Sequence, residues 1–163
     1  MVYLIVGASS DIGRELIKFI FSKEENATIY AHYNNSKEKL ENLCKELSIS
    51  CYDSNLLVKD KAGVHLIQAD LSENDGAAKI LKTLPVDEIN SLIFLPAYPF
   101  NYMRLKDLDI ETINKEMQVS VYSFLELAKA LVPSMKKLSG VNGNPVSSIF
   151  AMLTKYIVTK LTK

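Results

Sequence analysis

The 163-residue chain contains no tryptophan, two histidines and only two cysteines. Cys44 and Cys51 are seven residues apart, and neither a second cysteine pair nor a suitably spaced histidine accompanies them. Structural zinc sites need four such ligands at defined spacings. The sequence therefore predicts two free thiols, with no disulfide and no bound metal.

An excess of charge is also lacking, because nineteen basic and nineteen acidic residues cancel. No polybasic block is present, which argues against nucleic acid or an anionic membrane surface as a partner. No apolar stretch reaches the length of a membrane span, and no basic segment precedes the first apolar run. We expect a cytoplasmic protein whose partners are small molecules.

Hydrophobic residues are plentiful, at 48% of the chain against 23% charged. This balance is enough to build one hydrophobic core, and the length is that of one domain, residues 1–163. The chain opens with an apolar run at residues 2–6, typical of a parallel strand covered on both faces. A loop with glycine at both ends, residues 7–13, follows this run, and residues 14–21 have helical spacing.

Such a strand, glycine loop and helix can bind a phosphate. Gly7 permits a sharp turn at the strand end, and Gly13 lets the helix lie close to the sheet. Unpaired N–H groups at the helix N-terminus favour an anion, and a dinucleotide pyrophosphate fits there. The alternative is an ordinary strand-to-helix turn.

The loop Gly-Ala-Ser-Ser-Asp-Ile-Gly resembles the cofactor loop of the short-chain dehydrogenase/reductase family, Gly-x-x-x-Gly-x-Gly. Asp11 stands where the family has its middle glycine, and its carboxylate is interpreted as serving the helix end. The cofactor-binding residues that the resemblance implies here are Gly7, Ser9, Ser10, Asp11, Ile12, Gly13 and Arg14.

The resemblance covers essentially the whole chain and implies a doubly wound, Rossmann-type α/β fold with a parallel sheet. Strands are expected at residues 2–6, 27–32, 64–69, 91–95 and 145–150, in the order 3-2-1-4-5, with the C-terminal part of the usual fold missing. Helices are expected at residues 36–47 and 109–138. The stretch 48–63 is interpreted as an inserted surface excursion.

The end of the second strand bears on the choice of cofactor. An acidic residue there binds the ribose hydroxyls of NAD and would repel a 2′-phosphate. Asn34, Asn35 and Ser36 stand at this point instead, followed by Lys37. The pattern resembles that of the family's β-ketoacyl reductases, so NADP(H) is favoured over NAD(H). A simple polar turn is the alternative, but it does not explain the missing acid.

Two further strand ends are implied to border the cofactor. An Asp after the third strand binds the adenine in the family, so Asp70, with Leu71 beside it, takes that role by resemblance. The alternative is that Asp70 caps a helix beginning near Glu73. After the fourth strand the family has Asn-Asn-Ala-Gly, and this chain has Leu-Pro-Ala-Tyr, in which Ala97 matches.

The expected helix 109–138 has apolar residues on more than one face, which implies a partner helix. It resembles the family helix that forms a subunit interface, so a homodimer or tetramer is expected. Ser120 stands where family members often place an Asn that holds a water for proton relay.

The catalytic candidates are Ser148, Tyr156 and Lys160. Residues four apart share a helix face, and a nearby ammonium favours the phenolate of a general acid/base tyrosine. By resemblance, Tyr156 protonates the carbonyl oxygen, Lys160 also holds the ribose, and Ser148 orients the carbonyl. The pairs Tyr33/Lys37 and Tyr102/Lys106 have the same spacing, but only Tyr156 follows a strand bearing serines.

Two hypotheses remain open. The first is an NADP(H)-dependent oxidoreductase that interconverts a carbonyl and an alcohol. The second is a catalytically inactive nucleotide-binding or interaction module derived from such an enzyme. Asp11, Ser120, the residues around Ala97 and the short interval between Ser148 and Tyr156 favour the second. The chain stops at Lys163 where family members continue, so we expect a fragment, an incomplete sequence or a naturally reduced relative.

Overall fold

A computed structural model of the chain describes residues 1–53, 61–98, 109–139 and 147–152. The helices and strands in this part are, in chain order, β1 (Val2–Val6), α1 (Asp11–Lys23), β2 (Thr28–Tyr33), α2 (Lys37–Glu46), β3 (Cys51–Asp53), β4 (Gly63–Gln68), α3 (Gly76–Thr83), a 3-10 turn (Val86–Glu88), β5 (Ser91–Phe94), α4 (Ile110–Met117), a π-helical segment (Gln118–Tyr122), α5 (Ser123–Leu138) and β6 (Ser148–Ala151).

The strands form one parallel sheet in the order β3-β4-β2-β1-β5-β6. The five strands predicted from sequence are β1, β2, β4, β5 and β6. They lie in the predicted order 3-2-1-4-5, so the doubly wound α/β fold is confirmed. The order reverses between β1 and β5, the place where open sheets of this kind bind ligands.

The interpretation of residues 48–63 as a surface excursion alone is wrong. Residues 51–53 form the edge strand β3, paired in parallel with β4. The ring of Tyr52 stacks on His65 at 4.8 Å, and His65 stacks on Tyr30 at 4.9 Å. A row of three rings thus joins β3 to the sheet, and the buried His65 belongs to the packing.

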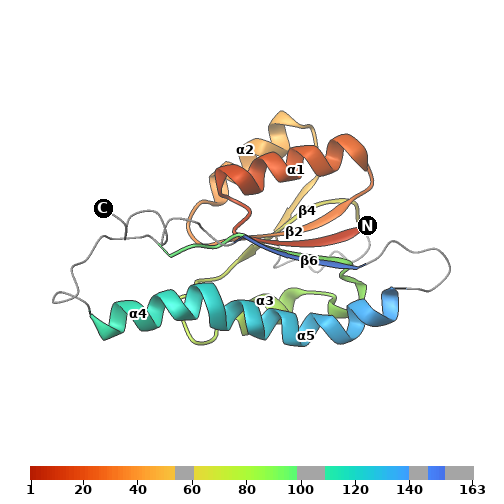
Figure 1. Ribbon diagram of the computed structural model, residues 1–163. Coiled ribbons are helices and arrows are strands. Elements are labelled where there is room, and N and C mark those ends of the chain that lie inside the picture. Colours follow the sequence, from red (N-terminus) through yellow and green to blue (C-terminus); the bar gives the residue numbers. More distant parts are fainter. Residues whose placement is uncertain (54–60, 99–108, 140–146, 153–163) are drawn as a thin grey trace, which may run out of the picture.

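Helices cover both faces of the sheet (Figure 1), with α1 and α2 on one side and α3, α4 and α5 on the other. The central strand β1 alternates between these two layers. Leu4 and Val6 pack in the core beneath α3 and α5, whereas Ile5 packs in the core beneath α1 and α2. None of these three side chains is exposed to solvent, as expected for a strand covered on both faces.

The predicted single helix 109–138 is present but has an internal irregularity. α4 and α5 follow one line in Figure 1, with the π-helical segment between them. The hydroxyl of Ser123 donates to the carbonyl of Gln118, five residues back, at 2.7 Å. A π turn inserts an extra residue into a helix and is often found at functional sites.

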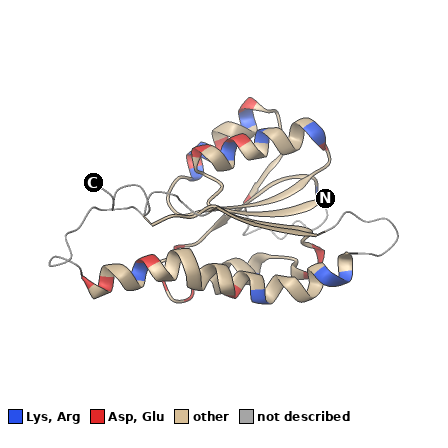
Figure 2. Cartoon of the chain, in the orientation of Figure 1, with Lys and Arg blue, Asp and Glu red and all other residues tan. Residues whose placement is uncertain are grey.

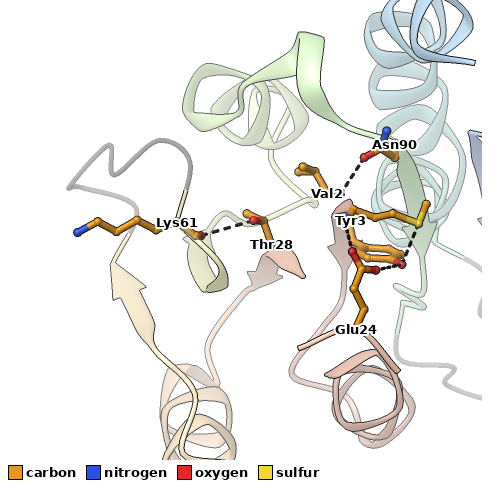
Figure 3. A network of polar contacts seen from close by, with 7 residues as sticks. Val2, Tyr3, Glu24, Thr28, Lys61 and Asn90 are labelled. Carbon is orange, nitrogen blue, oxygen red and sulfur yellow. Dashed lines mark hydrogen bonds and ion pairs between the residues drawn. The ribbon is translucent and has the colours of Figure 1, made fainter. Parts of the chain in front are cut away.

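Polar contacts fix the amino edge of the sheet (Figure 3). The α-amino group of Met1 pairs with Glu24 at the end of α1, and the Tyr3 hydroxyl donates to the same carboxylate at 3.0 Å. The Val2 N–H donates to Asn90 Oδ1 at 2.8 Å. The first two contacts join β1 to the end of α1, and the third joins it to the residue before β5. The parallel pairing of β1 with β5 places their carboxyl ends side by side.

Charges of both signs are interspersed over the outer faces of the helices, and the strands between them carry few (Figure 2). In the described part of the chain, no helix combines the length and the apolar character needed to cross a membrane.

Candidate functional site

The loop between β1 and α1 has a defined conformation. Gly7 has φ +78°, a backbone conformation that favours glycine, and a side chain there would also press on the backbone of Pro96 at 3.2 Å. Ser10 is the N-cap of α1, because its hydroxyl oxygen accepts the Gly13 N–H at 3.1 Å. The same hydroxyl donates to the Gly7 carbonyl at 2.8 Å. One serine therefore closes the loop and starts the helix.

Gly13 lets α1 approach this loop closely. A Cβ atom at Gly13 would lie 2.6 Å from the carbonyl oxygen of Ala8 and 2.7 Å from its Cα. Backbone atoms cannot yield as a flexible side chain does, so a larger residue would push the helix away from the loop. Gly13 therefore permits a close approach, as predicted, but the helix approaches the backbone of Ala8 in the loop.

Asp11, the residue that departs from the family pattern, is the first residue of α1 and points to solvent. Its carboxylate accepts from Arg14 Nη2 at 2.6 Å. It therefore lies in the first turn, where a negative charge favours the helix, but it does not cap the helix, because Ser10 does. The Nε atom of Arg14 is buried and has no hydrogen-bond partner among the described residues.

A cleft of about 680 Å³ opens at the carboxyl edge of the sheet, next to the glycine loop. We call it the carboxyl-edge cleft. Its lining residues are Gly7, Ser9, Ser10, His32, Asn34, Ser36, Lys39, Asp70, Leu71, Ser72, Leu95, Pro96, Ala97, Tyr98 and Val119. Predicted cofactor residues from the glycine loop and from the ends of β2, β4 and β5 therefore meet in one place.

Other predicted site residues do not line this cleft. They are Asp11, Ile12, Gly13, Arg14, Asn35 and Ser120. Ile12 is among the exposed apolar residues, and Gly13 acts through packing. Ser120 lies in the π-helical segment, whose Val119 reaches the cleft instead.

The segment after β2 contains no acidic side chain, and the arrangement of its cations differs from the prediction. The Lys37 ammonium pairs with Asp53 at 2.7 Å and with Glu41 at 3.3 Å, and these hydrogen bonds raise its pKa. Lys39, which the sequence analysis did not single out, lines the cleft. The sequence alone did not show that Lys39 lines the cleft whereas Lys37 pairs with Asp53.

Asp70 is held in a tight turn after β4. Its Oδ1 accepts the hydroxyl of Ser72 at 2.7 Å and the Ser72 N–H at 2.8 Å. These two hydrogen bonds lower the pKa of the carboxyl group, and a further hydrogen bond with Asn34 acts in the same direction. The N-cap of α3 is Asp75, so Asp70 does not cap that helix.

His32 is another lining residue that sequence reasoning missed. Its ring is 3% exposed and lies between two strand ends. Nδ1 accepts the Gly7 N–H at 3.2 Å, and Nε2 lies 3.0 Å from the Ala69 carbonyl oxygen. Burial lowers the pKa of the imidazole to about 4. The only signal in the sequence was a histidine just before the polar residues that end the strand.

The predicted catalytic residues are not brought together in the described part of the chain. Ser148 is the first residue of β6 and is paired in register with Ser91, whose hydroxyl lies 2.9 Å away. It therefore lies at the amino edge of the sheet, whereas the cleft lies at the carboxyl edge. The carboxyl end of β6 is Ala151, which has no hydroxyl. Tyr156 and Lys160 lie outside the described residues.

The family described as short chain dehydrogenase matches residues 1–154. The chain belongs to the short-chain dehydrogenase family. No curated protein sequence matches it.

Two solved structures illustrate the similarity. The RhlG/NADP active-site complex from Pseudomonas aeruginosa has 19% identity and a TM-score of 0.67, with 92% of this chain and 53% of that chain covered. A bulky-bulky ketone specific alcohol dehydrogenase from Comamonas testosteroni has 21% identity and a TM-score of 0.69, with 98% and 57% covered. These likenesses show the fold, and the chain spans little more than half the length of either structure.

Proposed function

We propose that the chain is an NADP(H)-binding oxidoreductase unit that interconverts a carbonyl and an alcohol. The observation that carries the proposal is the carboxyl-edge cleft, in which a capped glycine loop meets the ends of β2, β4 and β5. Such a crevice, at the point where the strand order reverses, is where doubly wound sheets bind nucleotides.

The residues at the cleft fit a dinucleotide. The glycine loop ends at the N-terminus of α1, where the helix dipole favours a pyrophosphate. Asn34 and Asp70 offer polar groups at the two strand ends that the family uses for the adenosine. The buried Nε of Arg14 is a donor without a partner among the described residues, which is compatible with a ligand anion beside the loop.

A preference for NADP(H) is supported by charge. Asn34, Asn35 and Ser36 follow β2 without a carboxylate that would repel a 2′-phosphate. Lys39 lines the cleft on the same side, and the nearby carboxylate of Asp53 is paired with Lys37.

The chemistry that a bound nicotinamide supplies is hydride transfer at the carbonyl carbon. In this proposal Tyr156 holds the proton that the carbonyl oxygen gains or loses, and Lys160 lowers the pKa of the phenol. Ser148 is left out of this step, because β6 places it at the opposite edge of the sheet.

The second candidate function is a nucleotide-binding module without catalysis. The position of Ser148 favours it, since a Ser that orients the carbonyl is missing from the described part of the cleft. Tyr98 lines the cleft where the family places a glycine, which also favours this reading. Both candidate functions predict nucleotide binding, and only the first predicts turnover.

Two measurements test these proposals. Titration with NADPH and NADH, followed by nicotinamide fluorescence, should show binding with NADPH preferred, and no binding at millimolar NADPH would reject both candidates. Carbonyl reduction is then compared between the wild type and Tyr156→Phe, for which we expect a loss of about 100-fold or more. Tyr102→Phe is the matched control, because Tyr102 and Lys106 have the same spacing. Equal rates in all three proteins would reject the catalytic role of Tyr156.

We also propose that the chain forms a homodimer or tetramer through α4 and α5. Exposed apolar side chains occur along α4, the π-helical segment and α5, namely Ile110, Met117, Tyr122 and Leu125. Exposed apolar side chains that gather along one helical layer often mark an interface.

A further inference from the structure

We propose that His32 is a positioning residue of the carboxyl-edge cleft, whose neutral imidazole ties the start of the glycine loop to the end of β4. The inference rests on the proposed nucleotide binding at this cleft and adds a residue that neither the family pattern nor the glycine motif contains. It concerns the arrangement of the loop, not the reacting atoms.

The hydrogen-bond partners determine which ring nitrogen carries the proton. The Ala69 carbonyl oxygen can only accept, so Nε2, at 3.0 Å, must be the N–H that donates to it. The Gly7 N–H can only donate, so Nδ1, at 3.2 Å, must be bare. Both nitrogens are satisfied only in the neutral Nε2–H tautomer.

The backbone of His32 holds the loop as well. Its carbonyl accepts the N–H of Ala8 at 2.8 Å, so two consecutive loop amides, those of Gly7 and Ala8, are bound by one residue. Ala69 directly precedes Asp70, so the other side of the ring is bound to the strand end that carries a proposed adenine contact. The imidazole therefore sets the distance between the phosphate side and the adenine side of the cleft.

Burial keeps the imidazole of this link neutral. The ring is 3% exposed, and burial lowers its pKa to about 4, although the bond to Ala69 and the charge of Asp70 act in the opposite direction. Lys39 and the phenol of Tyr98 line the same cleft. Asp11 and Arg14 lie on α1, paired with each other. Protonation of Nδ1 would place a second donor against the Gly7 N–H and so break the link.

A buried histidine can also serve packing alone, and the chain contains such a case. His65 is stacked between Tyr30 and Tyr52, and its Nε2 lies 2.9 Å from the Lys61 carbonyl oxygen. It is not among the residues that line the cleft. His65 is therefore the matched control: a buried, hydrogen-bonded histidine on the strand next to β2.

The first experiment measures binding of 2′,5′-ADP by calorimetry at pH 7.5. This probe is the adenosine part of NADP with its 2′-phosphate and its 5′-phosphate. His32→Leu removes both side-chain hydrogen bonds, and we expect at least a tenfold loss of affinity. In His32→Asn the side-chain oxygen can take the place of Nδ1 as acceptor for Gly7, but the bond to Ala69 is lost, so we expect a smaller loss of affinity than in His32→Leu, about threefold. His65→Leu is expected to bind as the wild type does, whatever its thermal stability.

These outcomes separate the inference from the proposed function. Wild-type binding combined with unchanged affinity in His32→Leu would overturn the inference alone, and so would equal losses in His32→Leu and His32→Asn, which would point to ring packing. If the wild type binds neither 2′,5′-ADP nor NADPH, the proposed function is rejected and, with it, a role of His32 in binding.

A second measurement needs no variant and no ligand. Nitrogen-15 spectra of the imidazole should show the neutral Nε2–H tautomer of His32 down to about pH 5, and the Gly7 amide should exchange slowly with solvent. An Nδ1–H tautomer, a charged ring at pH 6, or a rapidly exchanging Gly7 amide would overturn the inference even if His32→Leu does not fold.

Discussion

Asp11 places a negative charge in the first turn of α1. Its carboxylate also forms an ion pair with Arg14, the basic residue that follows the glycine loop. Replacing Asp11 by Asn removes this charge and releases the guanidinium. We expect binding of 2′,5′-ADP to become about two- to fivefold tighter, because charges near an exposed helix N-terminus are worth a few tenths of a kcal/mol to about 1 kcal/mol. Calorimetry at low salt is the measurement.

The control for this change is Glu15→Gln, which removes one negative charge from the same helix. Glu15 pairs with Lys18 at 3.2 Å, one turn further from the loop. Its replacement should leave the affinity unchanged. An equal gain in both variants would mean that net charge, and not the position of Asp11, governs binding.

His32 also gives the stability of the protein a pH dependence. Its pKa is about 4 in the folded protein against 6.5 for a free imidazole, so the unfolded chain takes up the proton first as the pH falls. Stability is therefore lost between pH 6.5 and pH 4, by about 3 kcal/mol in total, since each pKa unit is worth about 1.4 kcal/mol. Urea unfolding at pH 7, 5.5 and 4.5 measures it.

His32→Asn provides the comparison, because asparagine does not titrate. The variant should lose less stability than the wild type as the pH falls over this range. Above pH 7, the free energies of unfolding of the two proteins should change with pH in parallel. Parallel losses in the two proteins would show that other groups, such as the hydrogen-bonded carboxylate of Asp70, dominate the acid response.

At this scale the sequence predicted residues in the glycine loop better than those beyond it. Gly7 and Gly13 were predictable because backbone conformation and close approach leave few alternatives to glycine. Ser148 was given its catalytic role by resemblance to the family, in the strand expected at residues 145–150, but such a stretch does not show at which residue the strand begins or ends. The register with Ser91 decides that, and it is a property of the sheet.

At the scale of elements, α4 depends strongly on its cap. None of its residues is buried, so packing contributes little to it. Asp109 accepts the N–H of Glu111 at 3.2 Å and both the N–H and the hydroxyl of Thr112, at 3.1 and 2.9 Å. Asp109→Ala should cost about 1 kcal/mol locally. Amide exchange at residues 111–113 should then become about fivefold faster, because 1.4 kcal/mol corresponds to a factor of ten.

Asp109→Asn keeps an acceptor at the same place and should retain most of the protection. The midpoint of global unfolding should hardly change in either variant, since α4 adds no buried residue to the core. Equal exchange rates in Asp109→Ala and the wild type would show that something other than the cap holds the first turn.

Elements with a strong periodic pattern were predictable, and those without one were not. The apolar run of β1 and the helical spacing of α1 identify both elements from sequence. The strand β3 has only three residues, none of them buried, so no alternation announces it. The π-helical segment changes the spacing of side chains by one residue, too little to separate α4 from α5 in the hydrophobic pattern.

At the scale of the whole molecule, the proposed interface on α4 and α5 can be tested by charge. Tyr122 and Leu125 are exposed and lie one turn apart. Replacing both by Asp should convert the oligomer to a monomer, because two buried charges without partners would oppose association. Size-exclusion chromatography with light scattering measures the mass.

Phe19→Asp is the control, since Phe19 is equally exposed but lies on α1, on the other face of the sheet. Its replacement should leave the mass unchanged. A monomeric wild type would reject the proposed oligomer, and an oligomeric double variant would place the interface elsewhere.

The topology of the whole molecule was predictable because parallel strands joined by helices allow few arrangements, and the glycine loop selects among them. The arrangement of the catalytic residues was not predictable, because it depends on which residues lie at the strand ends. Ser148 illustrates this, since it lies at the amino edge of the sheet and the cleft at the carboxyl edge. The cytoplasmic location remains a prediction from sequence alone.

The fully buried Ser123 connects two surfaces. Its hydroxyl lies 2.7 Å from the Gln118 carbonyl and 3.4 Å from that of Leu71, at the wall of the cleft, while its neighbour Tyr122 faces outward. Subunit contact and nucleotide would then act on the same turn of helix. Thermodynamic linkage makes such an effect reciprocal: whatever factor nucleotide contributes to self-association, self-association returns to nucleotide affinity. The apparent dissociation constant for NADPH should accordingly vary with the concentration of the protein itself.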